Sequence, residues 1–201
     1  MNPALQSILR DPRVWQAQAE NHQQRSLKTG IAALDVLLPG GGWPLAALSE
    51  VLLPATGTSE LRVLLPSLAR QTAGDGWAAL VSPPLPPCAA GLAGHGVNLS
   101  RLLLVESGVD QLWAAEQILR SGQCRLVICW PGKISARQKH RLQLAAENGD
   151  SCCIAVLPDS RNEASSAALK LRLYPGADGL RLHILKNRGG RPGRECLLPH
   201  V

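Results

Sequence analysis

Residues 54–60, which read PATGTSE, occupy the position of a phosphate-binding loop. They lie between an apolar run at 48–53, LSEVLL, and an amphipathic run at 60–73. A strand, a glycine-rich turn and a helix in this order place backbone N–H groups against the phosphates of a nucleotide. The candidate residues of the loop are Pro54, Thr56, Gly57, Thr58 and Ser59. The segment order of a nucleotide site is therefore present, and its chemistry depends on these side chains.

The charged side chain that such a loop requires is missing. A lysine must reach the β- and γ-phosphates, and a hydroxyl must reach Mg²⁺. Gly57 is the one glycine of the loop, and Thr58 or Ser59 stands at the lysine position. No lysine occurs between Lys28 and Lys133. We therefore interpret the segment as a degenerate phosphate loop.

The two carboxylates of an ATPase are missing as well. An acid at the end of an apolar strand would hold the metal, and a glutamate after another strand would activate water. The apolar run at 125–130 ends in Trp130 and Pro131, and the run at 77–81 is followed by SPPLPP. Without these charges the transition state of hydrolysis loses much of its electrostatic stabilisation. We therefore expect a protein that is not an enzyme and that binds no cofactor.

Short apolar runs alternate with amphipathic segments from residue 27 onward, which predicts a mostly parallel sheet joined by helices. The expected strands are 48–53, 77–81, 101–105, 125–130 and 152–157, and the expected helices are 60–73, 110–121 and 135–147. Gly122 and Gly149 follow two of these helices, where a residue that tolerates positive φ is favoured. Residues 83–98 are too rich in proline and glycine for a long helix, so we expect them to begin as a loop.

The period of the apolar residues changes to two after residue 165. Apolar and polar residues alternate over 169–174 and 180–184, on either side of the turn PGADG. This pattern predicts an antiparallel hairpin with one hydrated, basic face. The loop RGGRPGR at 188–194 leads to a last short strand, ECLL. The predicted fold class is therefore α/β, with a mostly parallel sheet flanked by helices and an antiparallel hairpin at the C-terminus.

Residues 1–26 form a predicted helical arm and linker, and residues 27–201 form the predicted core. Asn2-Pro3 and Asp11-Pro12 are two helix starts, in which a capping side chain precedes a proline. The apolar positions of the arm are Leu5, Ile8, Leu9 and Trp15. Docking of this arm onto a partner and packing against the chain's own core are both open alternatives.

The composition fits a cytoplasmic protein without a metal site. No run approaches the ~18 apolar residues of a membrane span, and the N-terminus lacks the pattern of a signal sequence. We therefore expect a cytoplasmic location and no membrane partner. The six cysteines include no CxxC pair and no histidines at metal-ligand spacing, so we expect buried free thiols. Because the chain has no phenylalanine, we expect four tryptophans in or near the core, namely Trp43, Trp77, Trp113 and Trp130.

The chain carries a formal net charge of +6, and its C-terminal part is basic. Residues 161–201 hold eight Lys and Arg against three Asp and Glu. Lys133, Arg137 and Arg141 are spaced i, i+4 and i+8, which predicts three cations along one helical face. The candidate DNA or partner contacts are Lys133, Arg137, Lys139, Arg141, Lys186, Arg188, Arg191 and Arg194. An anionic partner such as DNA and a merely hydrated basic surface both fit these positions.

Several strings of the sequence resemble RecA-like proteins. TGIAALDVLLPGGGWPLAALSEVLLPATG resembles the beginning of the RecA core, and LHILKNRGGRPGRECLL resembles its closing strands. The closer resemblance is to the ImuA family, the RecA-like accessory proteins of bacterial mutagenesis cassettes. It covers nearly the whole chain and is carried by VW (14–15), LDVLLPGGGWP (34–44), PPLPP (83–87), LWAAEQILRSG (112–122), HRLQLAAE (140–147), SSAALKLRL (165–173) and ILKNRGG (184–190).

This resemblance implies a RecA-like fold and a role in the SOS response to DNA damage. ImuA proteins act with ImuB, a polymerase-like protein without catalytic activity, and with an error-prone DNA polymerase that copies past lesions. The implied function is non-catalytic support of translesion DNA synthesis and mutagenesis. The implied partners are RecA, ImuB and the error-prone DNA polymerase complex, with DNA as a further candidate. ImuA proteins are also related to SulA, an SOS inhibitor of cell division that binds FtsZ, so binding of FtsZ is the alternative function.

Overall fold

The computed structural model describes residues 25–55, 60–106, 108–159 and 165–200. The apolar positions of the predicted arm, Leu5, Ile8, Leu9 and Trp15, therefore lie outside the described residues. The division of the chain into an arm (1–26) and a core (27–201) stays a prediction.

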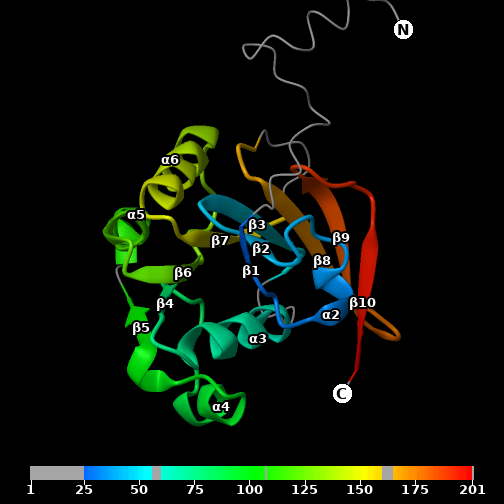
Figure 1. Ribbon diagram of the computed structural model, residues 1–201, viewed down its shortest axis with the longest axis horizontal. Coiled ribbons are helices and arrows are strands. Elements are labelled where there is room, and N and C mark those ends of the chain that lie inside the picture. Colours follow the sequence, from blue (N-terminus) through cyan, green and yellow to red (C-terminus); the bar gives the residue numbers. More distant parts are fainter. Residues whose placement is uncertain (1–24, 56–59, 107, 160–164, 201) are drawn as a thin grey trace, which may run out of the picture.

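An eight-stranded sheet runs through the centre of the core (Figure 1). From one edge to the other its strands are β10 (Glu195–Pro199), β9 (Gly179–Asn187), β8 (Leu169–Gly176), β3 (Ala47–Leu53), β7 (Cys152–Pro158), β6 (Cys124–Cys129), β4 (Trp77–Val81) and β5 (Leu102–Val105). The strands from β8 to β5 pair in parallel, whereas β9 and β10 pair antiparallel. The predicted α/β class and the C-terminal hairpin are confirmed.

Helices cover both faces of this sheet (Figure 1). One face carries α2 (Ala32–Asp35), α3 (Leu61–Thr72) and α4 (Ala89–Gly94), and the other carries α5 (Gln111–Ser121) and α6 (Ala136–Asn148). Alternate residues of β3 divide between the two faces, as the pleat requires. Val51 belongs to the apolar cluster that contains Leu64 of α3. Leu52 belongs to the cluster that contains Leu142 of α6.

Four shorter elements complete the described core. β1 (Ser26–Leu27) pairs with β2 (Trp43–Pro44) in a separate small sheet, and two 3-10 turns, η1 (Leu99–Arg101) and η2 (Gly108–Asp110), flank β5. α4 has six residues, in agreement with the prediction that 83–98 holds no long helix. Among the described helices, none combines the length and the apolar character that crossing a membrane requires.

The ends of α5 and α6 test the two glycine predictions. α5 ends at Gly122, whose φ of 66° confirms the expected left-handed residue. The same prediction is wrong for Gly149, whose φ is −96°, because the left-handed residue is its neighbour Asp150, with a φ of 49°. Gly149 is needed for a different reason, since a Cβ at this position would overlap the carbonyl oxygen of Leu119. The two helix ends are therefore in direct backbone contact.

The cysteines are buried as expected, with the exception of Cys88, which is exposed. Burial raises the pKa of Cys152 far above its ordinary value. A hydrogen bond with Cys129, followed by burial, raises the pKa of Cys153. Because the thiolate is the reactive form of cysteine, buried neutral thiols are inert.

Brief treatment of the native protein with iodoacetamide near neutral pH is therefore expected to alkylate Cys88 alone. Peptide mass spectrometry measures the modified positions. The same treatment in urea is the control, because it exposes all six thiols. Alkylation of Cys152 or Cys153 in the native protein as fast as that of Cys88 would contradict the prediction.

Candidate functional site

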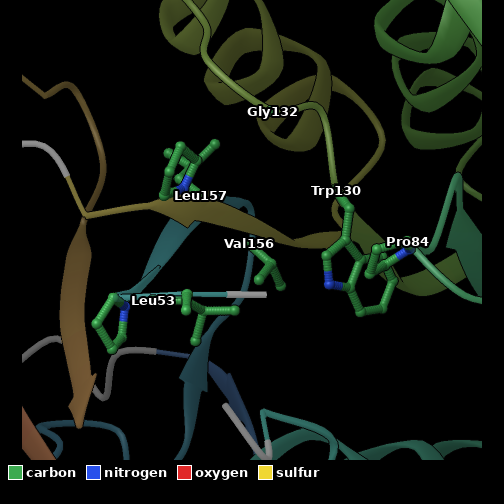
Figure 2. Close-up of a pocket in the computed structure, with 9 residues that line it drawn as sticks. Leu53, Pro84, Trp130, Gly132, Val156 and Leu157 are labelled. Atoms are coloured by element: carbon green, nitrogen blue, oxygen red, sulfur yellow. The ribbon is translucent and has the colours of Figure 1, made fainter. Parts of the chain in front are cut away.

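The parallel strands β3, β6 and β7 end around a small apolar pocket (Figure 2). Its volume is about 280 Å³, and its walls are Leu53, Pro54, Ala55, Pro84, Trp130, Gly132, Val156, Leu157 and Pro158. Pro54 and Ala55 begin the predicted phosphate loop, and its candidate residues Thr56, Gly57, Thr58 and Ser59 lie outside the described residues. Ligands of open α/β sheets bind outside the carboxyl ends of the strands. The pocket therefore lies where a nucleotide would bind.

Trp130 forms one wall of this pocket. Its backbone N–H donates to the carbonyl of Val81 at 3.1 Å, which fixes the start of the loop after β6 beside the end of β4. Figure 2 shows the indole with its nitrogen edge turned toward Val156. The indole Nε1 is buried and has no hydrogen-bond partner within the described part of the chain. The wall thus contains a buried donor without an acceptor.

None of the described residues that line the pocket is charged. A triphosphate with Mg²⁺ needs fixed positive and metal-holding groups around it. Ser82 stands after β4, where an ATPase would carry its glutamate, and its N–H donates to the carbonyl of Val105 at 2.7 Å. The volume is also just below the ~300–1,000 Å³ of typical small-molecule sites. The described walls of the pocket are therefore suited to an apolar group.

The arrangement of strands and helices around this pocket is similar to that of RadB recombinase. The solved RadB structure gives a TM-score of 0.68 at 18% sequence identity, and the match covers 86% of this chain and 95% of the RadB chain. The core has a RecA-like fold. The RecA-like part of the predicted resemblance is thereby confirmed, and the assignment to the ImuA family stays a prediction.

SulA from Pseudomonas aeruginosa is a second similar structure, at 25% sequence identity over 57% of this chain and 99% of the SulA chain. Its TM-score of 0.49 is too low to bear on fold or function. No protein-family model matches the chain, and the comparison with curated proteins gives no match.

Lys139 of the RecA-like core is buried, with 2% of its side chain exposed, so its prediction as a DNA or partner contact is wrong. Its Nζ lies 3.6 Å from Oε1 of Glu50, and the Nζ of Lys170 lies 3.7 Å from Oε2. Glu50 is fully buried in β3 and accepts a hydrogen bond of 2.5 Å from Ser165 Oγ. We call these four residues the buried ionic cluster. It joins α6 to β3 and β8, which sequence reasoning did not foresee.

The predicted helical face of three cations is also wrong. α6 begins at Ala136, so Lys133 lies in the preceding loop rather than on the helix. Arg141 donates to Oε2 of the buried Glu116 on α5 at 2.8 Å, so its charge is paired. Arg137, in the first turn of α6, and Lys133 are both exposed. These two cations lie at the end of the sheet that carries the pocket.

The basic loop at 188–194 lies at the opposite end of the strands from the pocket. β9 runs antiparallel to β8, and Asn187 at its end pairs with Leu169 at the start of β8. The pocket lies where the parallel strands end. The RecA-like core therefore does not bring the two predicted basic sets together on one surface.

The cations of this second set differ in exposure. Lys186 donates to the carbonyl of Ser165 at 2.9 Å, and burial, followed by the charge of Arg188, lowers the pKa of Lys186. Arg188, Arg191 and Arg194 are exposed. The three arginines are therefore the members of the set that remain available to an anionic partner.

Acidic partners reduce the basic character predicted for the outer face of the hairpin. The ion pairs on and beside this face are Lys170 with Glu50, Arg172 with Asp159, Arg181 with Asp178 and, when the imidazole is protonated, His183 with Glu195. The expectation of a freely hydrated basic face is therefore corrected, since most of its cations have a carboxylate within reach.

Two of the four tryptophans expected in or near the core are exposed. Trp43 is fully buried, whereas Trp77 is 38% exposed and Trp113 is 61% exposed. Trp77 lines a shallow groove of about 460 Å³ with Leu103 of β5 and Ile118 of α5. β5 is an edge strand, so the groove runs beside backbone that pairs on one side only. An exposed apolar surface next to an edge strand is a site where proteins dock.

Proposed function

We infer that this protein is a non-catalytic RecA-like accessory factor of SOS-induced translesion DNA synthesis. The observation that carries the inference is the uncharged pocket at the strand ends, in the place where a nucleotide would bind. A RecA-like core without groups for a triphosphate works through binding rather than hydrolysis. The link to translesion synthesis comes from the sequence resemblance to the ImuA family, which implies RecA, ImuB and an error-prone DNA polymerase as partners.

The edge of the sheet at β5 supports binding of a protein partner. Leu103 and Leu104 are 38% and 44% exposed on this strand, and Trp77 is exposed beside Leu103 in the same groove. Trp113 is exposed on α5, the helix whose Ile118 lines the groove. An extended segment can add to an open strand edge through backbone hydrogen bonds and place alternate side chains in a neighbouring groove. The exposed arginines of the loop at 188–194 are the proposed DNA contacts, because their side chains can reach phosphates.

The full chain, immobilised, is expected to capture purified RecA or ImuB at micromolar concentration. Replacing Trp113 by alanine is expected to weaken that capture about 10-fold or more, because large aromatic side chains dominate interface energies. Leu144→Ala is the matched control, since Leu144 is an exposed apolar residue on α6. Surface plasmon resonance measures both affinities. Absence of capture of either protein by the unaltered chain would remove the proposed function.

Nucleotide and FtsZ serve as comparison ligands in the same study. Titration with ATP and Mg²⁺ is expected to release no heat and no phosphate. FtsZ, the target implied by the relationship of ImuA proteins to SulA, is expected to assemble normally in the presence of the chain, as followed by light scattering. Phosphate release that disappears in a Thr58→Ala, Ser59→Ala protein would contradict a non-catalytic role.

A further inference from the structure

The walls of the pocket at the strand ends are rigid. Three of the lining residues are prolines, namely Pro54, Pro84 and Pro158. Val156 and Pro158 belong to β7. Proline has a fixed φ, and strand residues are held by the sheet, so little conformational entropy is lost when a ligand enters. The pocket is therefore ready to receive an apolar group without first closing around it.

Trp130 supplies the aromatic wall of the pocket. Its Nε1 is buried, on the edge of the ring that faces Val156, so the N–H is covered by the protein and is not open to a ligand. The rest of the side chain is only partly buried and lines the pocket. Because an aromatic ring packs well against a bulky apolar side chain, this wall favours such a group.

Two cations follow the wall of the pocket along the chain. Lys133 comes directly after Gly132, which lines the pocket, and Arg137 lies in the first turn of α6. Both side chains are exposed, and no ion pair of either is found within the described part of the chain. Asp159, which follows Pro158 of the wall, is paired with Arg172 at 2.9 Å. Carboxylates beside the apolar group of a ligand would therefore meet two cations that have no ion pair among the described residues.

We propose that this pocket binds one bulky apolar side chain of an acidic peptide segment on a protein partner. The apolar side chain packs against the ring of Trp130, and flanking carboxylates pair with Lys133 and Arg137. The inference rests on the proposed function, because a peptide-binding pocket serves a protein that acts by binding partners.

The test uses the full chain labelled with ¹⁵N and a synthetic peptide in which one phenylalanine stands between runs of aspartate. Each tryptophan gives one indole N–H signal, and the Trp130→Phe protein identifies the signal of Trp130. The peptide is expected to move this signal with a micromolar Kd. Peptides with alanine in place of phenylalanine, or lysine in place of aspartate, are expected to bind at least about 10-fold more weakly, a difference of about 1.4 kcal/mol.

A matched pair of charge variants locates the acidic contact. Lys133→Glu with Arg137→Glu is expected to weaken peptide binding about 10-fold or more. Arg191→Glu with Arg194→Glu changes the net charge equally at the opposite end of the strands, and is expected to leave peptide binding unchanged. Equal losses in the two proteins would overturn the proposed contact, because they would indicate attraction by net charge alone.

Three further results would overturn the inference. These are a Trp130 signal that no acidic peptide moves, equal binding of the alanine and phenylalanine peptides, and a signal that oligo-dT or ATP moves while the peptide does not. Capture of RecA or ImuB by the same preparation separates this failure from failure of the proposed function. Capture without peptide binding removes only the pocket ligand, whereas loss of capture by the unaltered chain removes the accessory role.

Discussion

Replacing Glu50 with glutamine is expected to lower the free energy of unfolding by about 3–5 kcal/mol, the cost of breaking a buried ion pair from one side. Glu50 is fully buried between Lys139 and Lys170, whose side chains are only 2% and 12% exposed. Glutamine has nearly the same shape, so the change removes the negative charge without creating a cavity. Two buried ammonium groups then lose the carboxylate that lies between them. In a chain of this size the melting temperature should fall by about 10 °C.

Urea denaturation followed by circular dichroism measures the loss, and Asp150→Asn is the control. Asp150 accepts a hydrogen bond of 2.6 Å from Arg25 in a pair that is 65% and 43% exposed. Asparagine tolerates the left-handed backbone of this position, and an exposed pair contributes at most about 1 kcal/mol. A loss for Glu50→Gln no larger than that of the control would show that the buried ionic cluster does not stabilise the fold.

The sheet could be predicted from the sequence because buried parallel strands are short apolar runs bounded by glycine or proline. The run at 77–81 is β4 itself, and the run at 152–157 is extended by one residue in β7. The hairpin was equally clear, since its apolar residues alternate with a period of two. Patterns of this kind involve only residues that are close together in the sequence. They can therefore be recognised without knowing the tertiary structure.

The partners of buried charges could not be predicted in the same way. Lys139 lies three and four residues before the buried Leu142 and Gln143, so helical periodicity alone places it on the inner face of α6. The local pattern does not indicate which strand packs against this face of α6. Glu50 comes from β3, far earlier in the chain, and only the strand order brings it to α6. A lysine without a visible partner therefore looked like a surface residue.

The exposure of Trp113 has a similar origin. Ala114 and Ala115 point into the core, and a tryptophan before them was expected to do the same. The sequence does not tell which strands lie at the edges of the sheet, and β5 is one of these two strands. A helix near an edge strand packs against less of the sheet. A larger part of its surface therefore stays exposed to solvent. The candidate pocket was foreseen only in its position, because its proline and tryptophan walls come from three separate loops.

Replacing Gly149 with alanine is expected to destabilise the fold by about 3 kcal/mol, at the upper end of the cost of overpacking a close contact. A Cβ at this position would overlap the carbonyl oxygen of Leu119, and the N–H of Gly122 lies 3.3 Å from the same point. Both obstacles are backbone atoms at the end of α5, so no side chain can turn away to make room. The ends of α5 and α6 would have to separate, and Ala146 and Leu119 would lose part of their burial.

Gly74→Ala is the matched control for this prediction, because Gly74 also follows a helix but has no atom within 4 Å of an added Cβ. At an unobstructed position the same change is neutral or slightly stabilising, since alanine restricts the unfolded chain. Thermal unfolding of both proteins gives the comparison. If Gly149→Ala proved as stable as Gly74→Ala, the two helix ends would not be in backbone contact, and Gly149 would have no steric role. A large loss confined to Gly149 would instead show that the glycine is required by the approach of α5, a constraint that no preference for positive φ supplies.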